Sequence, residues 1–434
     1  MTSVSIRPLP LRIALLLALT AAFAALSWFV VWEALGHSFV TFAARASDLT
    51  PEARLSGADT GARLAARDPF VHYMKGSLYL AAALDESIAP RLAAAVAALQ
   101  VAARLSPEDY RIWLALGRAL ERRGEMAEAR SAFERAALLA PHHFEPRWRL
   151  GNHLLRVGQR DEAFAEMRAA LSNRPAALPL IFDYAWNSFG GDARAVTAAL
   201  APPPEARALM VALLVGRGRV AEGLSLWRGG GGSPAPADVR RVTEALTGAG
   251  RYAAAYEIWL SAPAAARAAP DPGSLLSNGS FERDIALEAS DPFLTWRLAR
   301  SAGVTLSLDA MVRREGSRSL RLSFEVNDPS GRVIVAQTVP TSPGSYRLRY
   351  QARTENLQSL GPLALDVVDA ASGRTLASAA PPGGSQLWKS FELNFRTDPK
   401  TEAVSVRFIR PGCGESPCPL RGRIWLDNFE LGRR

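Results

Sequence analysis

A fixed offset of thirty-four residues in the middle of the chain restricts the fold more than any other feature. Pro107, Pro141 and Pro175 follow one another at this spacing. Further pairs share it: Leu116 and Leu150, Gly117 and Gly151, Leu120 and Leu154, Ala129 and Ala163, Ala136 and Ala170. Self-similarity at a period of 20–50 residues is the signature of stacked supersecondary units. The offset therefore predicts an α-solenoid built of helical hairpins.

The residue types at these positions suit a helical hairpin. Gly117 and Ala129 are small, which lets the two helices of one hairpin approach closely. Trp113 and Phe133 are large enough to fill the space between hairpins. Pro141 would end the second helix, because proline cannot continue a helix interior.

This pattern resembles the tetratricopeptide repeat. The matching positions are Trp113, Leu116, Gly117, Leu120, Ala129, Phe133, Ala136 and Pro141. The next repeat keeps the frame but has Arg147 and Met167 where large apolar and aromatic residues are expected. The resemblance implies a concave groove that binds a partner protein. The alternative is that the array only spaces the C-terminal domain from a membrane.

The repeat pattern weakens on both sides of this region. Upstream, the spacing predicts a further repeat with an insertion near Asp85 to Pro90. Downstream, two segments have similar sequences, Gly218 to Trp227 and Gly250 to Trp259. Their similarity predicts two more hairpins. The glycine run from Gly229 to Pro236 lacks the lysine of a phosphate loop. We therefore interpret it as a linker.

The N-terminal segment predicts the compartment. No residue from Ile13 to Trp32 is charged, and this length is enough to cross a bilayer. Arg7 and Arg12 precede the segment, so we expect the N-terminus in the cytoplasm of a bacterium and the rest beyond its inner membrane. The alternative is a signal peptide cleaved after the small residues Ala22-Phe23-Ala24.

The two cysteines agree with export. Cys413 and Cys418 lie in a loop rich in glycine and proline, which would close a small disulfide in an oxidising compartment. A zinc site would need more ligands, and the five histidines lie far away in the sequence. The sequence therefore predicts a disulfide and no zinc.

Strand periodicity replaces helix periodicity in the last third. Apolar residues alternate with polar ones, as in Leu320, Leu322, Phe324 and Val326. Similar segments follow near 346–352, 363–367, 391–395, 404–408 and 424–426, with turns such as Asp328-Pro-Ser-Gly between them. Many short strands in this length predict an antiparallel β-sandwich of the jelly-roll type.

This part resembles carbohydrate-binding modules of the galactose-binding-like type. The resemblance is carried by Leu276–Glu282, Gly316–Leu320, Pro343–Tyr346, Trp388 and Ile424–Leu431. It implies a structural calcium held by Glu282 and Asp427; the alternative is a surface acid and a turn-capping aspartate. It also implies sugar stacking on aromatic rings; the candidates are Trp296, Trp388 and Trp425, of which we select Trp296 and Trp388. The alternative is that each is a core residue, since Trp388 and Trp425 lie within strand patterns.

Composition and motifs limit the function. The formal net charge is +9, but the arginines form no cluster, so we expect no nucleic-acid partner. Attraction to anionic lipid or acidic polysaccharide stays open. No catalytic motif is present, which argues against an enzyme. We expect no required cofactor, and a calcium ion, where bound, would stabilise the fold and take no part in catalysis.

Together these features predict a multidomain α plus β protein. The expected parts are a cytoplasmic tail (1–12), a transmembrane helix (13–32), a juxtamembrane segment (33–66), the solenoid (67–262), a linker (263–274) and the sandwich (275–434). The predicted function is a periplasmic scaffold that binds a partner protein and a glycan, in assembly or export of a surface polysaccharide. The alternatives are a scaffold without sugar binding and an unrecognised glycan-active enzyme.

Overall fold

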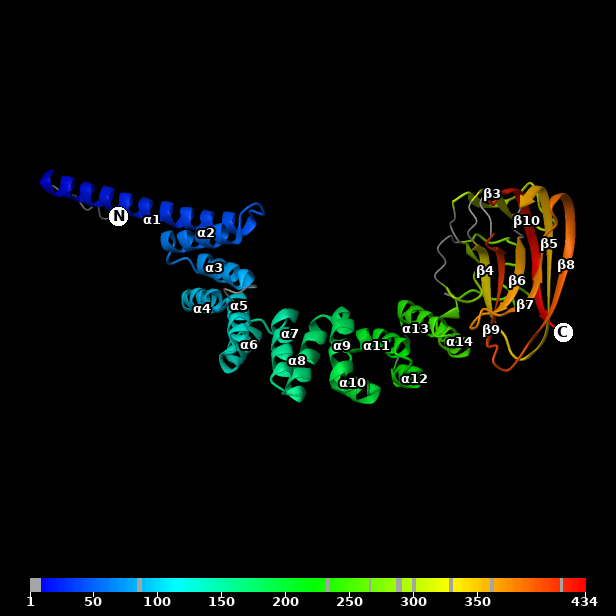
Figure 1. Ribbon diagram of the computed structural model, residues 1–434, viewed down its shortest axis with the longest axis horizontal. Helices are drawn as coiled ribbons and strands as arrows, with labels where there is room; N and C mark the ends of the chain where they lie inside the picture. Colours follow the sequence, from blue (N-terminus) through cyan, green and yellow to red (C-terminus); the bar gives the residue numbers. More distant parts are fainter. Residues whose placement is uncertain are drawn as a thin grey trace, which may run out of the picture. The chain divides into compact units, whose positions relative to one another are not determined.

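The computed structural model describes residues 9–83, 88–231, 234–264, 267–285, 291–298, 302–327, 331–359, 363–413 and 417–434 (Figure 1). Three segments named above lie outside the described residues: Arg7, the first half of the expected insertion (Asp85 to Ser87) and the turn at Asp328 to Ser330. The chain forms two compact units, residues 1–203 and 204–434. The α plus β fold class is confirmed: helical hairpins are followed by an antiparallel β-sandwich.

Unit 1 consists of helices. They are α1 (Leu9–Arg45), α2 (Pro51–Leu64), α3 (Pro69–Ala82), α4 (Ile88–Leu105), α5 (Tyr110–Arg123), α6 (Met126–Leu139), α7 (Phe144–Arg156), α8 (Arg160–Asn173), the 3₁₀ turn η1 (Pro175–Ala177), α9 (Leu178–Ser188) and α10 (Ala193–Leu200). Helices α1 and α2, α3 and α4, α5 and α6, and α7 and α8 pack as consecutive hairpins.

Close packing inside the hairpins explains the small residues of the repeat. A Cβ atom on Gly117 of α5 would lie 2.7 Å from the ring of Phe133 on α6. A Cβ atom on Gly151 of α7 would lie 2.9 Å from Met167 on α8. Gly124 has φ of +87° and ends α5 in the left-handed conformation that glycine adopts without strain.

Helix α1 is long and apolar enough, from Ile13 to Arg45, to cross a membrane. A signal sequence has the same properties. Its C-terminal part packs on α2, where a Cβ atom on Gly36 would lie 2.5 Å from the Cβ atom of Ala65. The apolar helix therefore continues without a break into the first hairpin.

Unit 2 begins with α11 (Pro204–Gly216), α12 (Val220–Arg228), α13 (Pro236–Gly248) and α14 (Tyr252–Leu260). The similarity of the two segments predicted two hairpins, and both are present. Gly218 and Gly250, with φ of +76° and +72°, make the turns within them. The expected linker at Gly229 to Pro236 joins α12 to α13, and Gly232 and Ser233 lie outside the described residues.

The sandwich is built from two antiparallel sheets of five described strands each (Figure 1). One sheet has the order β1-β4-β9-β6-β7 and the other β2-β3-β10-β5-β8. The bounds are β1 (Arg297–Leu298), β2 (Val304–Asp309), β3 (Ser319–Val326), β4 (Arg332–Pro340), β5 (Gly344–Ser359), β6 (Ala364–Asp369), β7 (Thr375–Ala379), β8 (Gly384–Thr397), β9 (Ala403–Arg410) and β10 (Leu420–Arg433).

The helices of unit 2 and the sandwich share one hydrophobic core. Tyr256 and Trp259 of α14 contact Phe293, with ring centroids 5.3 and 5.9 Å apart. The hydroxyl of Tyr252 donates to the carbonyl of Ala370 at 3.1 Å. The boundary between compact units therefore lies before α11 and not at the expected linker 263–274, because the last hairpin buries its open face on the sandwich.

Candidate functional site

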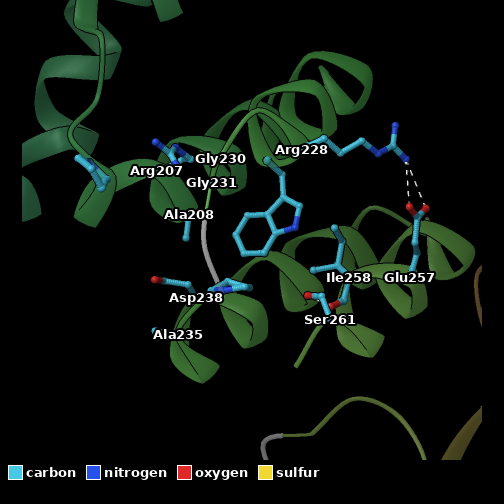
Figure 2. A pocket seen from close by; sticks show the side chains of 13 residues that line it. Arg207, Ala208, Arg228, Gly230, Gly231, Ala235, Asp238, Glu257, Ile258 and Ser261 are labelled. Carbon is cyan, nitrogen blue, oxygen red and sulfur yellow. Dashed lines mark hydrogen bonds and ion pairs between the residues drawn. The ribbon is translucent and has the colours of Figure 1, made fainter. Parts of the chain in front are cut away.

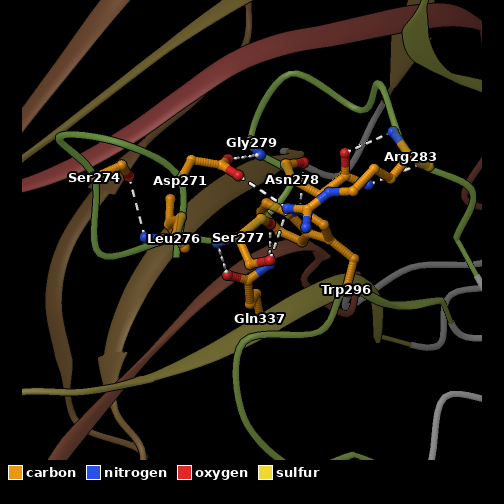
Figure 3. A network of polar contacts seen from close by, with 9 residues as sticks. All are labelled: Asp271, Ser274, Leu276, Ser277, Asn278, Gly279, Arg283, Trp296 and Gln337. Carbon is orange, nitrogen blue, oxygen red and sulfur yellow. Dashed lines mark hydrogen bonds and ion pairs between the residues drawn. The ribbon is translucent and has the colours of Figure 1, made fainter. Parts of the chain in front are cut away.

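The segment Leu276–Glu282, which carried the resemblance to carbohydrate-binding modules, forms a structural turn (Figure 3). Asn278 has φ of +54°, and its side-chain amide donates to the Arg283 carbonyl and accepts from the Arg283 N–H, both at 2.9 Å. The fully buried Gln337 exchanges two 2.8 Å hydrogen bonds with the backbone of Ser277. Asp271, from the expected linker, accepts from the N–H of Gly279 at 2.7 Å.

Trp296, one of the two selected sugar-stacking residues, belongs to the core. Its side chain is 3 % exposed and contacts the rings of Phe281 and Phe429 at 5.4 and 5.2 Å. Its indole N–H donates to the Asn278 carbonyl at 3.0 Å (Figure 3). No free ring face remains for a sugar.

Trp425 is also buried, although it lies on the outward-facing side of β10. Its neighbours Ile424 and Leu426 point into the sandwich. The indole N–H donates to Asp309 at 2.9 Å, and the Arg353 guanidinium lies 5.7 Å from the ring centroid. Arginine therefore covers this ring from the solvent side.

Trp388 is half-buried on β8, an edge strand of its sheet. Ala352 pairs with Lys389 and Thr354 with Gln386, so Leu387 and Trp388 together oppose Arg353 in a β-bulge. Leu387 is 76 % exposed. Of the selected tryptophans, Trp388 is therefore the one that can reach a ligand at the outer face of the sheet β2-β3-β10-β5-β8.

The outer face of the sheet β2-β3-β10-β5-β8 is polar. Its register places one row of side chains across four strands: Ser307, Arg321, Trp425 and Arg353. The outward positions of neighbouring rows include Ser323, Arg347, Arg349, Gln351, Ser390, Glu392, Asn394 and Arg423. Guanidinium, amide and hydroxyl groups of this kind bind hydroxylated or anionic ligands.

Glu282 and Asp427 hold the same turn, residues 314–318. Glu282 accepts from the N–H of Ser317 at 2.9 Å and from its hydroxyl, and Asp427 accepts from the N–H of Arg314 at 3.0 Å. The Ser317 hydrogen bond lowers the pKa of Glu282. Burial, and then the charge of Glu282, raise the pKa of Asp427.

The fit of this pair to calcium is incomplete. Both oxygens of each carboxylate accept hydrogen bonds, whereas calcium takes six or more oxygen ligands. No group of three or more His, Cys, Asp or Glu side chains that could hold a metal occurs among the described residues. The arrangement matches turn capping, and calcium binding stays a prediction.

Cys413 and Cys418 form a disulfide, with Cα atoms 6.3 Å apart. The N–H of Cys418 donates to the Asn327 carbonyl at 3.0 Å, and the buried Arg410 donates to the Cys418 carbonyl. Gly414 to Ser416 lie outside the described residues. The bridge therefore joins a loop that is also tied to the ends of β3 and β9.

A groove in unit 1 is lined by three arginines, although the sequence predicts no arginine cluster. Helices α3, α5 and α7 line a hollow of about 470 Å³. Arg111, Arg118 and Arg122 of α5 point into it, at positions i, i+7 and i+11, which share one helix face. This spacing is the sequence signal that could have revealed the cluster.

The charge of this groove is only partly compensated. Arg111 pairs with Asp109 at 2.6 Å, and Arg122 donates to the Leu80 carbonyl at 2.7 Å. The Arg118 guanidinium has no hydrogen-bond or ion-pair partner in the part of the chain that the structure describes. Burial, and then the neighbouring Arg149, lower the pKa of Arg118. An anion in the groove would relieve this repulsion.

One stretch of the helical part matches a known family. Residues 110–143, which contain α5 and α6, match the tetratricopeptide repeat family. This hairpin is a tetratricopeptide repeat. No curated protein matches the chain in sequence.

Solved structures resemble parts of the chain at low similarity. MamA is 21 % identical over 33 % of this chain and 81 % of its own, with a TM-score of 0.29. TmCBM61, solved with β-1,4-galactotriose, is 20 % identical over 37 % of this chain and 99 % of its own, with a TM-score of 0.27. The CBM22-1 xylan-binding domain of Paenibacillus barcinonensis Xyn10C is 15 % identical over 38 % and 97 %, with a TM-score of 0.26.

Proposed function

We propose that this chain is a membrane-anchored, non-enzymatic scaffold that holds an acidic segment of a partner protein in the α3-α5-α7 groove. The observation that carries the proposal is Arg118, a cation without a partner among the described residues, in the groove of a tetratricopeptide repeat. Peptide segments commonly bind in the concave surface of such solenoids. The arginines select a segment that carries carboxylates.

In this proposal the protein acts on the periplasmic side of the bacterial inner membrane. The apolar helix α1 would be the anchor, and the arginines before it would stay in the cytoplasm. A disulfide between Cys413 and Cys418 agrees with an oxidising compartment. With α1 continuous into the first hairpin, the repeats would begin at the membrane surface.

We also propose that the sandwich binds a glycan during assembly or export of a surface polysaccharide. The polar outer face of the sheet β2-β3-β10-β5-β8 carries the donors and acceptors that sugar hydroxyls need. Trp388 at the bulge offers an aromatic surface next to Arg353. We place the glycan there.

Binding of a labelled acidic peptide tests the groove. The full chain in detergent micelles would be titrated into a fluorescent peptide rich in Asp and Glu, and into its Asn and Gln counterpart. We expect the acidic peptide to bind, and Arg118→Gln to weaken binding about tenfold, or about 1.4 kcal/mol. Arg104→Gln, an exposed arginine on α4, is the matched control. Equal binding of both peptides would overturn the proposal.

A glycan array probed with the full chain, with and without calcium, tests the sandwich. If Trp388→Ala or Arg353→Gln abolishes glycan binding, the outer face of the sheet is the site. Trp296→Ala is uninformative about contact, because the loss of a core indole costs about 3–5 kcal/mol. Uniform absence of binding would reject the glycan function.

A second candidate function is a protein–protein scaffold whose sandwich binds no sugar. The burial of Trp296 and Trp425 favours it, because Trp296 lies in the core and Arg353 covers the ring of Trp425. The peptide and array experiments separate the two candidates, since the scaffold alone predicts peptide binding without glycan binding. An unrecognised glycan-active enzyme would show turnover of a bound glycan.

A further inference from the structure

A second hollow lies among the four helices of unit 2 (Figure 2). Its volume is about 450 Å³, within the range of about 300–1,000 Å³ that small-molecule sites occupy. Arg207 of α11, Trp227 of α12, Asp238 of α13 and Glu257 of α14 all line it. Nothing in the proposed function uses this hollow.

Arg207 supplies a free cation at one side of the hollow. Its half-buried guanidinium has no hydrogen-bond or ion-pair partner among the described residues. The group lies against Gly230, where any Cβ atom would collide with Nη1 (Figure 2). The missing side chain at Gly230 therefore leaves room for the guanidinium, whose planar donors match a carboxylate.

Trp227 supplies an apolar wall. The side chain is half-buried, and its carbonyl accepts from the Gly230 N–H at 3.1 Å, which fixes the turn after α12. An indole presents a large flat surface together with one polar N–H. Such a surface suits a ring that is apolar on its faces and polar at its edge.

Acceptors for hydroxyl groups lie on α13 and α14. Asp238 lies 3.8 Å from Arg241, and Glu257 lies 3.3 Å from Arg228. Figure 2 shows the second pair. Both carboxylates offer oxygen atoms that accept hydrogen bonds, and each lies beside an arginine. An acidic peptide would bring carboxylates to Arg207 but few hydroxyl groups to Asp238 and Glu257. A sugar acid brings one carboxylate for Arg207 and several hydroxyls for the two acceptors.

We infer that this hollow binds one acidic sugar unit of a polysaccharide. The uronate carboxylate would contact Arg207, the ring would lie on Trp227, and ring hydroxyls would donate to Asp238 and Glu257. The inference rests on the proposed glycan function and places a second glycan site beside the sandwich, within unit 2. It also defines the ligand class as anionic.

Calorimetric titration of the full chain in detergent micelles tests the inference, with trigalacturonate as the probe and neutral galactotriose as its uncharged counterpart. We expect trigalacturonate to bind and galactotriose to bind at least tenfold more weakly. Arg207→Gln should weaken trigalacturonate binding about tenfold. Arg240→Gln, an exposed arginine of α13 outside the hollow, should leave it unchanged.

The variants also separate this inference from the sandwich proposal. If trigalacturonate binding is unchanged in Trp388→Ala and weaker in Arg207→Gln, the hollow is the binding site. This holds even if the outer face of the sheet binds nothing. If binding is weaker in Trp388→Ala and unchanged in Arg207→Gln, the inference about the hollow is wrong and the site on the sandwich is retained. Equal affinity for both trisaccharides, or no binding heat, also overturns it. Unchanged thermal unfolding of Arg207→Gln would show that its effect is on binding.

Discussion

The side chain of Glu402, in the loop before β9, accepts a hydrogen bond from the backbone N–H of Ala253 at 2.7 Å. Ala253 is the second residue of α14, whose N-cap residue Arg251 makes no side-chain capping bond. A residue of the sandwich thus caps the last helix of the repeat array. Free N–H groups at a helix start are among the groups that need such a partner.

Loss of this cap should destabilise unit 2. Glu402→Ala is expected to lower the free energy of unfolding by about 1 kcal/mol, which corresponds to a fall of about 3 °C in Tm for a unit of this size. Glu402→Gln keeps an oxygen acceptor and should lose less. Differential scanning calorimetry of the full chain in detergent measures both, and an unchanged Tm for Glu402→Ala would show that the contact is not a cap.

Close packing at Gly117 leads to a prediction in unit 1. A methyl group there meets the ring of Phe133, so Gly117→Ala should lower the free energy of unfolding by about 2 kcal/mol. Adding Phe133→Leu should restore part of the loss, because the smaller side chain makes room. Urea unfolding gives both values. Losses that simply add in the double variant would contradict the packing argument.

Acid dependence is expected at the turn held by Glu282. Its pKa lies below the ordinary value of 4.5, so the stabilisation is present above that value and is lost as pH falls through the lowered pKa. Glu282→Gln should therefore cost about 1 kcal/mol at pH 7 and progressively less below pH 4. Asp427 has a raised pKa, so its contribution to stability is lost as pH rises. A Glu282→Gln cost that is the same at pH 7 and pH 3 would contradict this assignment.

Calcium is the remaining prediction at the same turn. An ion shared by Glu282 and Asp427 would raise Tm by mass action, and the rise would vanish in Glu282→Gln and Asp427→Asn. The hydrogen bonds found here favour the opposite result, an equal Tm in calcium and in chelator. Thermal melts of the full chain in both conditions decide between the two.

Local patterns made much of the fold predictable. The offset of thirty-four residues predicted the hairpins at α5 to α8, and alternation predicted β3, because both signals come from neighbours along one helix or strand. Gly218 and Gly250 likewise marked the turns of the two later hairpins. Such periodicity says which face of an element is apolar.

Long-range contacts were not predictable in this way. Alternation places Trp425 on the outward side of β10, yet Asp309 and Arg353 cover it. Glu402 reaches Ala253 across 149 positions of sequence, and no local pattern relates the two. The spacing of Arg111, Arg118 and Arg122 places them on one face of α5, but only the packing of α3 and α7 shows that this face lines a groove.

A measurement of membrane topology is the decisive experiment, because the disulfide, the glycan and the partner protein all depend on the compartment. Alkaline phosphatase, which is active only outside the cytoplasm, would be fused after Arg434, and a cytoplasm-restricted reporter would be fused at the same place in a second strain. We expect phosphatase activity in the membrane fraction and an inactive cytoplasmic reporter. Activity of the cytoplasmic reporter alone would contradict it.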